Sequence, residues 1–135
     1  MSFVEVSHTA DVKIRATAPT LATLFSEALT ALMQVLYGPD RKGGQKREIV
    51  VDAEDHESLL RDFLSEVLFV AEVDGLVFTG AEIHIEECHL VAVLDGEPFD
   101  RRRHTQGTEV KGISYSGLAI THDANGYKLD IVFDV

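Results

Sequence analysis

The chain has 135 residues and a formal net charge of −11, from 23 acidic and 12 basic side chains. Proteins that bind nucleic acids use lysine and arginine to displace counterions from phosphates. The excess of acidic over basic residues therefore argues against direct nucleic-acid binding. It suits a basic partner protein or a hard cation instead. The length favours one domain over residues 1–135. The single cysteine, Cys88, excludes an internal disulfide and a thiolate zinc site.

The sequence also gives no sign of a membrane or secreted protein. No apolar stretch approaches the roughly 18 residues that a membrane span needs. The residues after Met1 contain no basic segment leading into an apolar one, so no signal peptide is expected. We therefore expect a cytoplasmic protein without membrane contact.

The first third of the chain predicts two short strands and a helix. Residues 3–6 read as a strand, and residues 12–18 alternate apolar and polar side chains as a half-buried strand does. In the helix that follows, apolar residues recur every three or four positions. Thr20 suits its N-cap, and Gly38 suits its C-terminal stop.

The remainder predicts a second helix surrounded by strands. Asp55 suits the N-cap of this helix, which is expected to end at residues 74–75. Strands are expected at residues 48–53, 77–86, 88–94, 109–115, 118–122 and 127–135. Turns or loops are expected at residues 95–98 and 100–107, and at the Asn125-Gly126 pair, a strong hairpin signal. These elements predict a two-layer α+β fold, with two amphipathic helices packed on a mostly antiparallel β-sheet.

Three acidic groups are candidates for a metal site. The final strand ends in Asp134 and Val135, which supply a side-chain carboxylate and an α-carboxylate. Placed near Asp11, they would form an all-oxygen cluster of the kind that calcium, magnesium or manganese prefers. Exposed acidic residues are more often simply solvated. His8, three residues before Asp11, could line the same pocket or only hydrogen-bond the turn.

Other polar residues allow a functional and a structural interpretation. His84 and His89 lie on neighbouring predicted strands and could form a second metal site, but solvated surface residues are the commoner case. The run at residues 101–103 is three arginines, which could bind RNA or a phosphate, although local ion pairing is the commoner role of such a run. No Gly-x-Ser-x-Gly element and no Cys/His arrangement indicates a nucleophile.

Several motifs taken together resemble the archease family. They are His8-Thr9-Ala10-Asp11 before an amphipathic helix, the segment at residues 62–69, Gly96-Glu97-Pro98-Phe99-Asp100 with His104, the segment at residues 107–111, and the ending at residues 131–135. The resemblance covers nearly the whole chain in order. Each motif alone is weak, and the combination is specific.

The resemblance implies a function that composition does not indicate. Archeases are accessory proteins of RtcB-type RNA ligases, which join RNA ends in tRNA splicing and RNA repair, using GTP and manganese. They promote formation of the ligase–guanylate intermediate and multiple turnover, and would meet RNA only through the ligase. The implied metal ligands are Asp11, Asp134 and the Val135 carboxylate.

The resemblance also leaves roles open. His8 is expected to hold the turn, and Glu109 and Lys111, on one face of a strand, are candidate contacts to the partner or to nucleotide phosphates. The sequence departs from the family pattern at Lys13 and Ser116, where a small residue and a histidine are common. Two alternatives remain: a general chaperone-like modulator of RNA-processing proteins, or a small metal-dependent hydrolase with His8 as its base.

Overall fold

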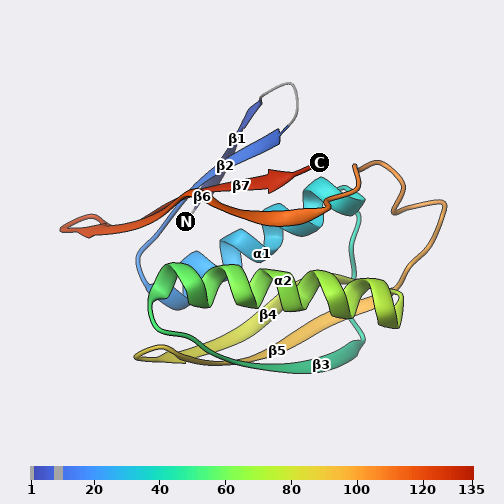
Figure 1. Cartoon of the computed structure of the whole chain (residues 1–135). Helices are drawn as coiled ribbons and strands as arrows, with labels where there is room; N and C mark the ends of the chain where they lie inside the picture. The colour runs from blue at the N-terminus through green and yellow to red at the C-terminus, as the bar shows by residue number, and fades with distance from the viewer. Residues whose placement is uncertain (1, 8–10) are drawn as a thin grey trace.

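The computed structural model describes residues 2–7 and 11–135, without the side chains of residues 5–7. In this part of the chain, two helices lie between two antiparallel sheets (Figure 1). The four-stranded sheet has the order β1 (Ser2–Ser7), β2 (Asp11–Ala18), β7 (Gly126–Asp134) and β6 (Gly112–Asp123). The three-stranded sheet has the order β3 (Gln45–Asp52), β5 (His89–Pro98) and β4 (Leu76–Glu86). The helices are α1 (Leu21–Tyr37) and α2 (His56–Asp74).

The expected α+β class, with two helices packed on antiparallel strands, is confirmed. The strands divide into two sheets rather than one, because the helices are apolar over a wide arc. Helix α1 packs against β4 on one side and β2 on the other, and α2 packs against β3 and β6. The buried apolar side chains of α1 accordingly follow one another closely, at Leu24, Phe25, Ala28, Leu29, Ala31, Leu32 and Met33.

Local signals set the helix ends as predicted. The side chain of Thr20 accepts a hydrogen bond from the backbone N–H of Thr23 (3.2 Å), and Thr23 reciprocates in a capping box. Asp55 accepts from the N–H of Ser58 (2.7 Å), and this bond lowers the pKa of its carboxyl. Gly38 and Gly75 terminate α1 and α2 with positive φ angles of 88° and 63°.

The predicted turn at residues 95–98 is wrong, because β5 continues to Pro98. Gly96 pairs with Gln45 on one side and Phe78 on the other. A Cβ on Gly96 would lie 2.5 Å from the Val77 carbonyl oxygen. This glycine therefore permits a close approach of two strands and does not form a turn.

The end of the chain forms the predicted hairpin, with its turn one residue earlier. Asp123 pairs with Gly126, so Ala124 and Asn125 are the central residues of the turn. The N–H of Asn125 donates to Asp123 Oδ1 (2.8 Å), and Gly126 takes the positive φ of 118°. The side chain of Asp123 thus stabilises the turn that the Asn-Gly pair signals.

A single cluster of buried apolar side chains joins both helices to both sheets. Its largest fully buried members include Phe25, Phe63, Phe78 and Phe133. Neither helix in the described part of the chain is long and apolar enough to cross a membrane.

Candidate functional site

The strand register brings two of the predicted metal ligands together. Asp11 opens β2, Asp134 closes β7, and the two residues are directly opposite in the antiparallel pair. Directly opposite residues project from the same face of a sheet. That face is the one turned away from the helices, because the alternate positions Ile14 and Ala16 are buried. We call Asp11 and Asp134, with the following Val135, the acidic tip.

A pocket of about 450 Å³ lies behind the acidic tip. Asp11 and Val135 line one side of it, and Gln34 and Val35 from the last turn of α1 line another. Figure 1 shows the end of β7 next to the C-terminal end of α1. The pocket thus lies on the helix-facing side of the sheet, opposite the outer face from which the Asp11 and Asp134 side chains project. A helix C-terminus carries partial negative charge, and the last turn of α1 has no basic residue.

The donor set of the acidic tip fits a hard divalent cation that keeps part of its water shell. The described residues contain no group of three or more His, Cys, Asp or Glu side chains arranged to hold a metal ion. The side chains thus supply two carboxylates, Asp11 and Asp134. Magnesium-like ions are commonly bound through one or two carboxylates, with water or phosphate oxygens completing the shell.

Lys111 joins the acidic tip through its backbone. Its N–H donates to the carbonyl oxygen of Asp134 (2.7 Å), and its side chain is exposed. The prediction that Glu109 and Lys111 share one face of a strand is wrong. Strand β6 begins at Gly112, so both residues lie in the segment before it. His8 lies outside the described residues, so its predicted role stays a prediction.

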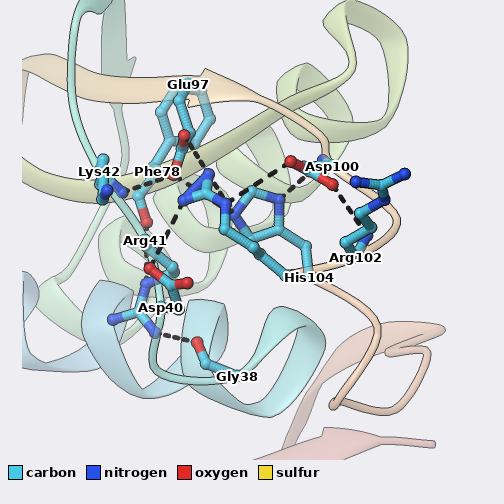
Figure 2. Close-up of polar contacts among 10 residues, drawn as sticks. Gly38, Asp40, Arg41, Lys42, Phe78, Glu97, Asp100, Arg102 and His104 are labelled. Carbon is cyan, nitrogen blue, oxygen red and sulfur yellow. Dashed lines mark hydrogen bonds and ion pairs between the residues drawn. The ribbon is translucent and has the colours of Figure 1, made fainter.

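The segment after β5 contains a buried polar cluster (Figure 2). At its centre, the His104 side chain is 1% exposed. The backbone N–H of Asp100 donates to Nδ1 of His104 (2.8 Å). Because Nδ1 accepts this bond, we assign the ring proton to Nε2. Nε2 in turn lies 3.3 Å from Oε2 of Glu97. The ring therefore connects the loop backbone with the end of β5.

Glu97 and Arg103 extend this cluster to the loop after α1. Glu97 accepts a hydrogen bond from the N–H of Lys42 (2.7 Å) and forms an ion pair with Arg103. Arg103 also lies 3.4 Å from Asp40 and 3.6 Å from Asp100. Of the two predictions for the arginine run, the structure places Arg103 as a local ion-pair partner. We call Asp40, Glu97, Asp100, Arg103 and His104 the His104 network.

Asp100 closes the loop on itself. Its carboxylate accepts from the N–H of Arg102 (2.8 Å), and this bond, with the nearby Arg103 charge, lowers the pKa of Asp100. Its carbonyl oxygen accepts from the N–H groups of Arg103 and His104. The loop is thereby held by main-chain bonds as well as by ion pairs.

The chain runs from the His104 network directly to the acidic tip. The N–H of Thr108 donates to the Val35 carbonyl (2.7 Å) at the end of α1. A Cβ on Gly107 would overlap the backbone of Leu36, so no side chain fits there. Val110 is buried, and Lys111 then bonds to Asp134. The sequence motif at residues 96–111 is thus one continuous support for the tip, a role that sequence reasoning missed.

A second metal site at His84 and His89 is not supported in the described residues. His84 lies 3.1 Å from Glu82, and His89 lies 2.6 Å from Asp52. The two histidines therefore have different carboxylate partners, and both pairs are exposed. This is the solvated arrangement that the sequence favoured.

Comparison with known proteins agrees with the fold and the motif. A solution structure of Methanobacterium thermoautotrophicum protein 1598 superposes with a TM-score of 0.85, at 25% identity and 98% coverage of each chain. The crystal structure of an archease, described as a possible chaperone, from Thermotoga maritima has a TM-score of 0.68 at 21% identity. It covers 96% of this chain and 94% of that one, and supports the fold alone.

Sequence relatives give the family. The protein archease of Methanosarcina mazei is 35% identical over 136 residues, covering 96% of this chain and 93% of the relative. Residues 3–135 match the Archease protein family. This chain belongs to the archease family.

Proposed function

We propose that this protein is an accessory factor of an RtcB-type RNA ligase, which promotes ligase guanylylation and multiple turnover in tRNA splicing and RNA repair. Membership of the archease family supports the proposal. The observation that carries the proposal is the direct pairing of Asp11 with Asp134. The segment at residues 96–111 ends beside this pair, where the N–H of Lys111 donates to the carbonyl oxygen of Asp134. In this role the protein is not itself an enzyme, and it meets RNA only through the ligase.

The proposed working site is a divalent cation held by Asp11, Asp134 and the Val135 carboxylate. Calcium, magnesium and manganese all suit this oxygen donor set. The bound cation would supply positive charge at the tip of an acidic protein, beside the phosphates of the ligase reaction. Asp11 and Asp134 orient it from two neighbouring strands, and the His104 network holds the adjoining segment in place.

The net charge of −11 supports a basic docking surface on the partner. Complementary charge accelerates encounter and selects partners more than it strengthens the final complex. Stimulation of the ligase should therefore weaken as ionic strength rises, because salt screens exposed charges.

The test is GTP-dependent guanylylation of the cognate ligase under multiple-turnover conditions. Wild type should stimulate the reaction, and Asp11→Asn and Asp134→Asn should not. Glu66→Gln is the matched control, because Glu66 is an exposed acid on α2 away from the tip. No stimulation by wild type contradicts the partnership. Normal stimulation by both tip variants contradicts the metal role and favours a chaperone-like modulator, the role suggested for the Thermotoga protein.

A further inference from the structure

The outer face of the four-stranded sheet carries a second pocket, of about 510 Å³, beside the acidic tip. Its lining comes from three strands and from the bulge in β6. We call this the outer pocket; its polar side chains are Asp11, Lys13, Arg15, Ser114, Ser116 and Asp130. Pockets of this size accept small organic ligands, with a few polar groups fixing their orientation.

The strand register shows how the outer pocket is built. Lys13, Val132 and Ser114 form one row across β2, β7 and β6. The next row toward the tip is Asp11, Asp134 and Gly112. Rows on one face are about 7 Å apart, because each residue of a strand advances about 3.3 Å. Gly112 has no side chain, and Asp134 Oδ2 lies 3.9 Å from the position that a Cβ there would take.

The bulge in β6 adds the opposite wall. Its register shifts between Ser114 and Ala119, and Gly117 within it has a positive φ of 76°. A Cβ on Gly117 would meet no atom within 4 Å, so space and not crowding surrounds this turn. Ser116 lines the pocket from the same bulge. Two hydroxyl groups, from Ser114 and Ser116, therefore lie across the pocket from Lys13.

The charged residues that line the outer pocket favour an anion only when a cation is bound beside it. Arg15 and Asp130 form an ion pair through Arg15 Nε (2.7 Å) and largely neutralise each other. Lys13 and the hydroxyls then offer donors to an anion, whereas Asp11 repels one. A divalent cation at Asp11 and Asp134 removes this repulsion. Three carboxylates leave an ion that takes six or more oxygen ligands with open positions, which phosphate oxygens commonly fill.

We propose that the outer pocket binds a phosphate group chelated to the divalent cation of the acidic tip, with Lys13, Ser114 and Ser116 holding its oxygens. Such a phosphate is either free polyphosphate or the phosphate chain of a nucleotide. This inference rests on the proposed function for its cation and deepens it, because it gives the tip a phosphate ligand. It also gives a role to Lys13 and Ser116, the two positions at which the chain departs from the family pattern.

The test is an amide NMR titration of the full chain with pyrophosphate in the presence of Mg²⁺. Shift changes should concentrate at residues 11–15, 114–117 and 130–134. Lys13→Ala should weaken binding about tenfold, the effect of losing one charge-assisted hydrogen bond. Lys128→Ala is the matched control, because Lys128 is an exposed lysine on β7, opposite Thr17 and outside the pocket lining.

A second arm replaces pyrophosphate by GTP to distinguish the two sources of phosphate. Equal affinities assign the pocket to polyphosphate, and tighter GTP binding with further shifts assigns it to a nucleotide. The proposal is overturned if neither probe shifts these residues, or if Lys13→Ala and Lys128→Ala bind equally well. An unchanged unfolding temperature for Lys13→Ala ensures that any lost binding does not reflect a lost fold.

Binding and ligase stimulation can fail separately. Phosphate binding without stimulation of the ligase would contradict the proposed function and leave the pocket assignment standing. Stimulation of the ligase without phosphate binding would contradict the pocket assignment and leave the proposed function standing.

Discussion

The acidic tip and the His104 network differ in the groups that surround their carboxylates. In the network, Glu97 is mostly buried, accepts a hydrogen bond from the N–H of Lys42, pairs with Arg103 and lies 3.3 Å from Nε2 of His104. At the tip, Asp11 and Asp134 are two like charges directly opposite each other on neighbouring strands. Like charges in this position destabilise a sheet. The network therefore stabilises the fold, whereas the tip is a local cost that a cation would offset.

The first prediction removes the centre of the network. His104→Ala should lower the free energy of unfolding by about 3 kcal/mol, because it empties the site of a fully buried ring and leaves the Asp100 N–H without its acceptor. Urea denaturation measures this change. Arg101→Ala, an exposed neighbour in the same loop, should change it by less than about 0.5 kcal/mol. Equal effects for the two variants would show that the network contributes little.

The second prediction disturbs the path between the two regions. Gly107→Ala should lower the free energy of unfolding by about 2 kcal/mol, because the new methyl group overlaps the backbone of Leu36. Gly80→Ala is the control, since a Cβ there meets no atom within 4 Å. If the connection matters to the site, Gly107→Ala should also reduce ligase stimulation under conditions where the variant is fully folded.

The third prediction concerns the tip alone. In a chelator, Asp134→Asn should raise the free energy of unfolding by about 0.5 kcal/mol, because one of two opposed charges is removed. Mn²⁺ or Ca²⁺ should raise the unfolding temperature of wild type, since a ligand of the native state stabilises it, and should have less effect on the variant. A variant that is less stable than wild type in chelator would contradict the repulsion.

The smallest effect is expected from acid. The pKa values of Asp55, Asp95 and Asp100 are lowered from 3.8, chiefly by backbone N–H groups that bond their ionised carboxylates. A carboxyl whose pKa is lower in the folded state binds fewer protons there, so its contribution is complete above the unfolded value and disappears as the pH falls through the folded value. Stability should therefore decline below about pH 4. Asp100→Asn should flatten this decline in urea titrations, and Glu66→Gln should not.

Sequence reasoning succeeded where the signal is local. Thr20 and Gly38 mark the ends of α1 through bonds within a few residues, so their roles could be predicted. That Asp11 and Asp134 lie close together was implied by the family resemblance and not by a local signal. The register of β2 and β7 then places them together.

The failures arise where residues distant in sequence set the local structure. Gly96 reads as a turn residue, and only the crowding of Val77 and Phe78 around it explains its place within a strand. Glu97 meets Lys42 across the chain, so no spacing rule predicts the bond. The outer pocket likewise depends on the bulge in β6. The Ser116-Gly117 pair reads as a break between two strands, and only the pairing with β7 shows one bulged strand.

The pairing of β2 with β7 has a consequence for how the protein is made. One strand is synthesised near the start of the described chain and the other at its end. During translation, β2 therefore has an unfilled edge until β7 emerges, and contacts this distant in sequence form slowly. The two carboxylates meet only when that last strand is in place. If a cation binds the acidic tip as proposed, it would bind molecules in which β7 has paired with β2, and its binding would report that this pairing has formed.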